Sequence, residues 1–594
     1  MTQADRPRPG RAPFADLFLP IAIAVLTLLA FGPALQGDFV SWDDDRNFIT
    51  NPDYRGLGIT QLRWMWSTFH LGHFVPLSWM SLGLDFEIWG MEARGYHLTN
   101  LLLHAVAALA LYAIARRLLT LSVTTERDVA RRTTAVALAA AFGALLFAVH
   151  PLRTESVAWI TERRDVLSGS LSLLSLYCYL RAHEDGHGMR RWYWGALALF
   201  GCGVLSKGTV LTLPALLLVL NVYPLRRLGG ASGWWNVATR RVYAGLVPFA
   251  LVGGATAVMS FVALQEVPQL PPTGKVAVSL YGLAFYTWKT LAPTQLAPLY
   301  TLPLDLDPFA ARYLSSGAMV LAITATLIGL RRRWPALLAT WIVFVLALFP
   351  MLGFHQNGPQ IVADRYTYHA APVLSLLAAG ALLLAFRSRQ RRLAILASAA
   401  GVLTLGALTW RQSRIWVSSE ALWAQVIRVD TMGWIGENNW GNILMMKGRF
   451  AQAERHFGLA ADRHPGYAEA FNNLGVSRAQ QGRAAEAVEP LRRALAIRAT
   501  YDEAQVNLGT ALAQLGEPEQ AMREFEGALR INARNTAAHV NWGNALLRLQ
   551  RPLEAIPHYK EALRIEPENV AARTNLEVAR SQSAPRSAPL SARR

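Results

Sequence analysis

Long apolar runs follow one another from residue 14 to about residue 410, whereas residues 434–569 contain no apolar run of eighteen residues. A helix needs about 20 predominantly apolar residues to cross the hydrocarbon core of a bilayer. The first part of the chain is therefore expected in a membrane, over residues 15–410, and the second part in water. Eleven spans are predicted, at residues 15–35, 97–116, 134–150, 166–181, 192–206, 208–223, 243–263, 313–330, 334–353, 370–386 and 393–410.

A 34-residue period organises the second part of the chain. Glycine recurs at 441, 475, 509 and 543, each time after Trp or Leu, and alanine recurs at 453, 487, 521 and 555. This period is typical of the tetratricopeptide repeat, a helical hairpin that stacks into an α-solenoid. The array with its capping helix is expected over residues 434–582, after a connecting helix in 411–433. The last stretch, 583–594, is expected to be disordered.

The distribution of charge predicts which side of the membrane each part occupies. The chain has 58 Lys and Arg against 40 Asp and Glu, yet residues 434–569 hold 16 of each, so the excess lies in the tails and in short connections. Such a distribution indicates topology rather than nucleic-acid binding. Basic residues mark every even-numbered connection, which places these connections and the tail at 1–14 in the cytoplasm. With an odd number of spans, the repeats are predicted on the outer side.

The first outward connection carries three consecutive acids in "FVSWDDDRNFITNP", residues 39–52. Asp45 with Arg46 is readily interpreted as a solvated turn. Asp43 and Asp44 are stronger candidates, because other outward connections supply possible partners and ionisable residues at a membrane edge often serve function. Two adjacent acids also leave a loosely held divalent cation possible, although no metal site is predicted.

Two further outward segments carry candidate ligand-binding residues. In "GYHLTNLLLH", His97, Asn100 and His104 form one helical stripe; they either hydrogen-bond to a substrate or to the acids, or are packing residues. In "HPLRTESVAWITERRDVLSG", residues 150–169, a continuous helix would place an acid, an aromatic ring and a guanidinium on one face. The alternative is an interfacial helix with surface ion pairs. The candidates from this segment are His150, Glu155, Trp159, Arg163 and Asp165.

Cations suited to a phosphate lie in the later outward segments. Lys207 interrupts an apolar stretch in "LSKGTV", where the alternative is a lysine that snorkels to the membrane surface. Arg365 and Tyr366 stand at the start of the tenth span in "VADRYTYHAAP", and Lys289 precedes the eighth. A fixed positive charge at these positions would stabilise a phosphate leaving group.

Five motifs in this order, followed by the repeats, resemble the transmembrane and tetratricopeptide-repeat-containing protein family, more specifically its bacterial branch. They are FVxxDD with NP eight residues after the first Asp, YHLTNLLLH, HPLRTESVAW..ERRDVLS, LSK...TLP and ADRYTY. The family belongs with the GT-C type of glycosyltransferase, which includes the protein O-mannosyltransferases. In these enzymes a polyprenyl-phosphate sugar donates to an acceptor on the outer side of the membrane.

The resemblance implies roles for the candidate residues. Asp43 and Asp44 would be the acidic pair of the first connection, one of them expected to act as base or to orient the acceptor. The second outward motif would supply His150, Glu155, Arg163 and Asp165. Lys207 and Arg365 would hold the donor phosphate. The expected protein is thus a GT-C-like glycosyltransferase of the bacterial inner membrane, whose periplasmic repeats recruit a protein or peptide acceptor. A non-catalytic repeat scaffold for envelope proteins and a transporter of lipid-linked sugar are the alternatives.

Overall fold

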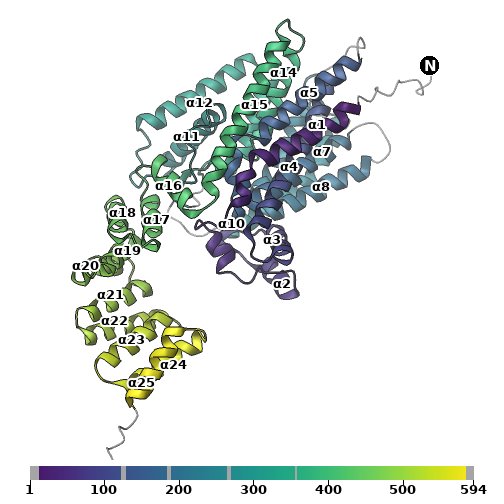
Figure 1. Cartoon of the computed structure of the whole chain (residues 1–594). Helices are drawn as coiled ribbons and strands as arrows, with labels where there is room; N and C mark the ends of the chain where they lie inside the picture. The colour runs from purple at the N-terminus through teal and green to yellow at the C-terminus, as the bar shows by residue number, and fades with distance from the viewer. Residues whose placement is uncertain (1–12, 122–128, 184–188, 264–268, 355–357, 584–594) are drawn as a thin grey trace, which may run out of the picture. The chain divides into compact units, whose positions relative to one another are not determined.

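The computed structural model describes residues 13–121, 129–183, 189–263, 269–354 and 358–583 (Figure 1). The chain divides into two compact units, residues 1–429 and 430–594. Both are helical, and the described residues contain one two-stranded antiparallel pair. The predicted all-α fold with a C-terminal α-solenoid is confirmed at this level. Most of the predicted N-terminal tail and nearly all of the predicted disordered tail lie outside the described residues.

The first unit is a helical bundle with α4 near its centre. α4 packs against α1, α5 and α7, while α7 packs against α8 and α5 against α14. A Cβ added to Gly143 of α5 would lie 2.8 Å from the backbone oxygen of Ser375 in α14, so only glycine permits this close approach. The helices are α1 Pro13–Ala30, α2 Ile59–Ser67, α3 Pro76–Trp89, α4 Ala93–Leu121, α5 Val129–Ala148, α6 Thr154–Ala158, α7 Arg163–Arg181, α8 Met189–Ser206, α9 Leu213–Val222, α10 Val237–Ala263, α11 Pro272–Leu291, α12 Ala311–Leu330, α13 Pro335–Leu348, α14 Ala371–Ala385, α15 Arg391–Ser413 and α16 Ser419–Val429.

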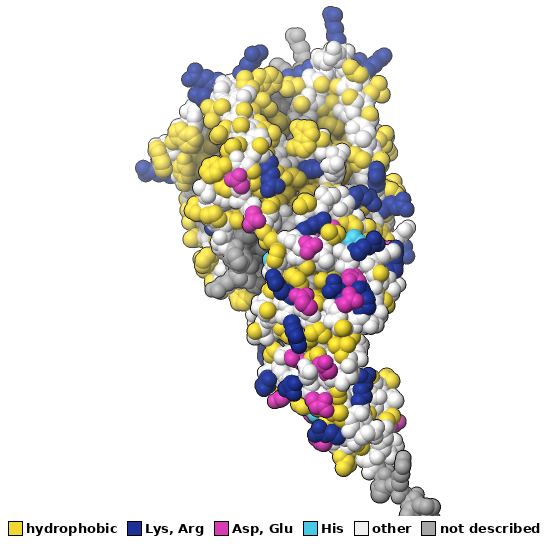
Figure 2. Space-filling model, turned by 90° about the vertical axis from the view of Figure 1, so that its left-hand side faces the viewer, with side chains coloured by type: hydrophobic (Ala, Val, Ile, Leu, Met, Phe, Trp, Pro, Cys, Tyr) yellow, Lys and Arg dark blue, Asp and Glu magenta, His cyan; other side chains and the backbone are white. Residues whose placement is uncertain are grey.

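Every predicted span overlaps a helix, but fewer helices are long and apolar enough to cross a membrane. By length and composition, four described helices qualify: α4, α10, α12 and the helix over 391–416. A fifth span results if residues 133–148 and 151–158, which meet at a bend of 54°, are counted together. The number of eleven stays a prediction. On the face drawn in Figure 2, hydrophobic side chains cover much of this unit, whereas acidic and basic side chains intermingle over the repeats.

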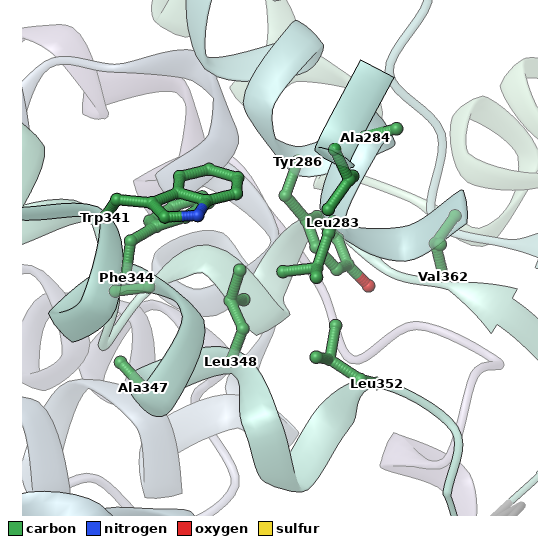
Figure 3. Packing of buried hydrophobic residues seen from close by; sticks show 11 residues of the cluster. Leu283, Ala284, Tyr286, Trp341, Phe344, Ala347, Leu348, Leu352 and Val362 are labelled. Carbon is green, nitrogen blue, oxygen red and sulfur yellow. The ribbon is translucent and has the colours of Figure 1, made fainter. Parts of the chain in front are cut away.

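One helix, α11, falls in a connection where the sequence predicted none, and it supports the segment that carries Arg365. A buried cluster joins Leu283 and Tyr286 of α11 to Phe344 of α13 and Val362 of strand β2 (Figure 3). β2, Gln360–Val362, pairs antiparallel with β1, Tyr300–Thr301. A 3₁₀ turn at Asp364–Thr367 follows directly. The cluster therefore fixes the start of the turn on which Arg365 stands.

The second unit is a stack of helical hairpins that confirms the predicted repeats. A Cβ on Gly441 would lie 2.5 Å from Phe457, and one on Gly509 would lie 2.6 Å from Phe525. The repeated glycines are therefore explained by the close packing of helix A on helix B. Four hairpins and a last helix comprise α17 Trp434–Met446, α18 Phe450–Arg463, α19 Ala468–Gln480, α20 Ala484–Ile497, α21 Asp502–Gln514, α22 Pro518–Ile531, α23 Thr536–Arg548, α24 Pro552–Ile565 and α25 Val570–Ser583.

Candidate functional site

Glu162 lies at the centre of a buried network of alternating charges. Its carboxylate accepts hydrogen bonds from Arg164 Nη2 at 2.7 Å and Lys207 Nζ at 2.7 Å, and Arg365 Nε lies 3.3 Å away. Burial raises the pKa of Glu162, but the three positive charges outweigh burial and hold that pKa well below its usual range. The group is therefore ionised at neutral pH and holds three cations together.

Two further acids complete the network. Glu155 forms an ion pair with Arg365 and also accepts a hydrogen bond from its backbone N–H at 2.9 Å. Asp165 accepts from Lys207 Nζ at 2.7 Å and from Ser156 Oγ at 2.9 Å. The side chains of the three acids are at most 2% exposed, whereas those of the three cations are 10–15% exposed. The three acids are thus more deeply buried than the three cations. The cations keep an accessible surface suited to a phosphate.

Asp44 fastens the first outward connection to this network. Its Oδ2 accepts from Val40 N at 3.0 Å, and its Oδ1 accepts from the backbone N–H and the hydroxyl of Thr161 at 3.2 and 2.6 Å. Burial raises the pKa of Asp44 to about 7, although the three hydrogen bonds lower it. Because both carboxylate oxygens bind protein groups, Asp44 holds the connection beside Glu162.

Asp43 differs from Asp44 in both backbone and contacts. Its φ of 71° lies in the left-handed region, which is uncommon for residues other than glycine. Within the described part of the chain, no hydrogen bond or ion pair joins its carboxylate to another residue. Burial raises the pKa of Asp43, while Arg164 and Arg365 lower it. A strained, unbonded carboxylate beside cations is the arrangement expected of a reactive acid or base.

A pocket of about 170 Å³ adjoins Asp43. It lies between the first connection, the segment that precedes α3, the first turns of α3 and the turn before α7. Ser78 in its wall donates a hydrogen bond at 2.8 Å to the backbone oxygen of Ser206, which precedes Lys207. The pocket is therefore linked to the charged network through Arg164 in its lining and through the contact of Ser78 with the residue before Lys207. Its lining includes Asp43, Asn47, His70, His73, Trp79 and Arg164.

The single helical face predicted for Glu155, Trp159 and Arg163 is wrong. α6 ends one residue before Trp159, whose φ of −87° and ψ of 121° are extended, and α7 begins only at Arg163. Arg163 is consequently fully buried and donates to Asp85 Oδ2 at 2.6 Å and to Asn100 Oδ1 at 2.5 Å. Arg163 thus forms a buried ion pair with Asp85 of α3. The ring of Trp159 instead lies under the guanidinium of Arg365, 5.5 Å from the ring centroid.

The stripe of His97, Asn100 and His104 on α4 is buried. Asn100 donates to the backbone oxygens of residues 157 and 159, both at 3.2 Å. His104 contacts the hydroxyl of Tyr368 at 2.8 Å and the backbone oxygen of residue 148 at 2.9 Å. His97 is 1% exposed. Asn100 and His104 therefore hold neighbouring turns in place, as packing residues do, and a role in ligand binding stays a prediction for all three.

His150 and Lys289 make hydrogen bonds to groups outside the network, whereas Tyr366 contacts Arg365 of the network. His150 accepts from the backbone N–H of residue 152 at 3.2 Å, and its Nε2 lies 3.0 Å from the backbone oxygen of residue 290. Lys289 Nζ donates to the backbone oxygen of residue 294 at 2.5 Å. The ring of Tyr366 lies 5.0 Å from the guanidinium of Arg365. Lys289 thus holds the segment before β1, and Tyr366 supports Arg365.

Sequence reasoning missed Glu162 and Arg164. Arg164 lines the pocket and Glu162 contacts the three cations of the network. The signal was the run of four charges in "ERRD", of which only Arg163 and Asp165 were assigned. The described residues hold no group of three or more His, Cys, Asp or Glu placed to ligate a metal.

Family descriptions match both units. Residues 128–250 match the family described as dolichyl-phosphate-mannose-protein mannosyltransferase. Residues 438–503, 478–541 and 536–569 match tetratricopeptide repeat families. Among solved structures, YrrB, a TPR protein with an unusual peptide-binding site, is 19% identical and covers 27% of this chain and 82% of its own, with a TM-score of 0.24.

Protein O-mannosyl-transferases are among the curated relatives. Protein O-mannosyl-transferase TMTC1 of Homo sapiens is 26% identical over 515 residues, which cover 76% of this chain and 56% of that protein. TMTC1 of Mus musculus is 25% identical, with 79% and 60% covered. TMTC2 of Homo sapiens is 30% identical over 220 residues, 34% of this chain and 24% of that protein. The alignments thus span less than two thirds of these relatives. The predicted resemblance to the family is confirmed, and its bacterial branch stays a prediction.

Proposed function

We propose, on the premise that this chain is related to the transmembrane and tetratricopeptide-repeat-containing protein O-mannosyl-transferases, that it is a membrane glycosyltransferase of the GT-C type. It moves a hexose from a polyprenyl-phosphate donor to a hydroxyl of a protein or peptide acceptor. The mannosyltransferase match over 128–250 includes Glu155, Glu162, Arg164 and Lys207, which belong to the charged network.

Asp43 acts as the base in this proposal. Its carboxylate takes the proton of the acceptor hydroxyl while the acceptor oxygen bonds to the anomeric carbon of the sugar. The bond between that carbon and the phosphate oxygen breaks, and its electron pair leaves on the lipid phosphate. Inversion at the anomeric carbon is expected from the family type. Asp44 serves as a positioning residue, because its oxygens hold the connection that carries Asp43.

The charge that develops on the leaving phosphate is met by Arg164, Lys207 and Arg365. Each of these cations is fixed by Glu162, and each remains 10–15% exposed. Fixed charges stabilise a developing anion more than mobile solvent does, because they need no reorganisation during the reaction. The buried acids also offset the mutual repulsion of the three cations before the donor binds.

The observation that carries the proposal is the contrast between the two adjacent acids. Asp44 has both oxygens bound by protein groups, whereas Asp43 is held in a strained backbone conformation beside a pocket with no protein partner for its carboxylate among the described residues. A scaffold has no use for an unsatisfied, half-buried carboxylate next to Arg164. Strain of this kind persists where the surrounding structure enforces it, often at active sites.

The repeats are proposed to recruit the acceptor. Asparagines at residues 473, 507, 541 and 575 occupy the same register on successive A helices, and each donates to a polar side chain of the preceding A helix. All four are half-buried. A row of carboxamides offers donors and acceptors to an extended peptide backbone. The proposed location is the bacterial inner membrane, with the N-terminus in the cytoplasm and the repeats in the periplasm.

Reconstitution of the purified full chain into vesicles tests the proposal. Vesicles would receive a panel of polyprenyl-phosphate hexoses together with envelope proteins, and mass spectrometry would detect added hexose. Transfer from at least one donor, absent without the lipid donor, is the expected result. If no donor yields added hexose while envelope proteins still bind the repeats, the scaffold alternative is favoured. Movement of the lipid-linked sugar across the bilayer without transfer would favour the transporter.

A further inference from the structure

The pocket beside Asp43 contains buried polar groups without protein partners. Trp79 lines the pocket and is 5% exposed, and its indole N–H has no hydrogen-bond acceptor among the described residues. His70 is a second lining residue, and its buried Nε2 has no hydrogen-bond partner in the described part of the chain. An unpaired buried polar group costs about 1–3 kcal/mol, so such groups in a pocket wall indicate a polar ligand.

The remaining groups of the wall define the chemistry of that ligand. Asp43 offers a carboxylate that only accepts hydrogen bonds. Asn47 donates from Nδ2 to the hydroxyl of Thr161 at 2.9 Å, and its Oδ1 is an acceptor for a ligand. The Trp79 indole and the Arg164 guanidinium only donate. Burial lowers the pKa of His73 to about 3, so this imidazole is neutral and has one donor and one acceptor nitrogen.

A wall that mixes donors and acceptors in this way fits a ring with several hydroxyl groups. A phosphate only accepts and would be repelled by Asp43, and a hydrocarbon chain would satisfy none of these groups. The single hydroxyl of an acceptor side chain would leave most of them unpaired. The indole of Trp79 and the ring of Phe48 in the same wall supply apolar faces for the C–H groups of a sugar ring.

We infer that this pocket binds the hexose ring of the lipid donor, and that Trp79, His70 and His73 determine which hexose is accepted. The inference rests on the proposed function for the identity of the donor. It assigns the two parts of the donor to different groups: the cations bind the phosphate, the pocket binds the sugar, and Asp43 lies between them. Sugar recognition is then separable from recognition of the lipid phosphate.

Binding of two lipids to the full chain in detergent tests the division. The probes are a short-chain polyprenyl-phosphate-mannose and the same polyprenyl phosphate without sugar, and affinity is measured by titration calorimetry. Trp79→Phe keeps an aromatic ring and removes the N–H. It is expected to weaken binding of the sugar-bearing lipid by roughly tenfold, as for one lost hydrogen bond, and to leave the sugarless lipid unchanged.

Trp64→Phe is the matched control, because Trp64 lies 5.1 Å from Trp79 between ring centroids and is not part of the pocket wall. It is expected to change neither affinity. His70→Phe provides a second variant with the same expected pattern should Trp79→Phe fail to fold. A donor analogue that lacks the hydroxyl bound by Trp79 should bind the wild type and Trp79→Phe equally.

The inference is overturned if the wild type binds both lipids equally tightly, or if Trp79→Phe and His70→Phe weaken both lipids to the same extent. Because the readout is binding, it is independent of turnover. A sugar-dependent loss of affinity without any transfer would contradict the proposed enzyme and retain the sugar pocket. Hexose transfer without a sugar-dependent loss of affinity in the variants would support the proposed enzyme and contradict the sugar pocket.

Discussion

Replacement of Glu162 by Gln should destabilise the membrane unit more than any other single charge removal in the network. The substitution keeps the shape of the side chain and removes one negative charge that faces Arg164, Lys207 and Arg365 at 2.7, 2.7 and 3.3 Å. The new amide also presents N–H groups to cations that can only donate. Three positive charges then share the two remaining acids, Glu155 and Asp165.

The expected cost follows from burial. The Glu162 side chain is 0% exposed, and removal of one partner from a buried ion pair typically costs about 3–5 kcal/mol, because the other charge is left uncompensated. The charges around Glu162 depress its folded pKa, so this contribution is fully present above the unfolded pKa of the group. It is lost as the pH falls through the folded pKa, and the difference between wild type and variant should therefore be constant from pH 6 to 8 (about two to four units above the unfolded value).

Thermal unfolding of the full chain in detergent, followed by size-exclusion chromatography, measures this difference. Glu92→Gln is the matched control, since Glu92 is an exposed acid of the same unit. Glu162→Gln should lower the Tm by several degrees, and Glu92→Gln should leave it unchanged. Equal Tm values for the two variants would refute the reasoning that Glu162 organises the three cations.

Three further predictions follow from particular contacts. Burial raises the folded pKa of Asp44 to about 7, so its stabilising contribution is complete below the unfolded pKa and is lost as the pH rises through 7. The Tm measured from pH 5 to 8 should therefore fall for the wild type and fall less for Asp44→Asn. Parallel curves of Tm against pH would contradict this expectation. Gly509→Ala should lower the Tm of the repeats, because its Cβ would lie 2.6 Å from Phe525, whereas Gly458→Ala, with no atom within 4 Å, should not. A reporter that is active only in the cytoplasm, fused after residue 583, should stay inactive in cells; activity would show that the number of spans is even.

The helices and repeats were predictable because their signals are periodic and local. Apolar runs place the membrane helices, and the 34-residue step places the hairpins. α11 escaped because Lys275, Ser279 and Lys289 interrupt its apolar residues, and it packs against α12, α13 and β2, which lie 20 or more residues further along the chain. Strands of two and three residues that pair across 60 positions leave no periodic pattern at all.

The site was predicted in composition and only partly in arrangement. The motifs brought forward Asp43, Glu155, Lys207 and Arg365, all of which lie at or beside the pocket and its network. The choice between Arg163 and the residue after it depended on the break in the helix at residue 159, where Asn100 of α4 donates to the backbone oxygens of residues 157 and 159. The pocket wall from residues 70 to 79 carried no signal, because isolated His and Trp residues are common in packed membrane-surface segments.

The most direct test of the account compares Asp43→Asn with Asp45→Asn in the reconstituted transfer reaction. Asn tolerates the left-handed backbone of residue 43, so the substitution removes the base and keeps the connection in place. The account predicts that Asp43→Asn lowers the transfer rate by about 10²–10⁴-fold with donor affinity retained, while Asp45→Asn transfers at the wild-type rate. Transfer by Asp43→Asn at the wild-type rate would contradict it.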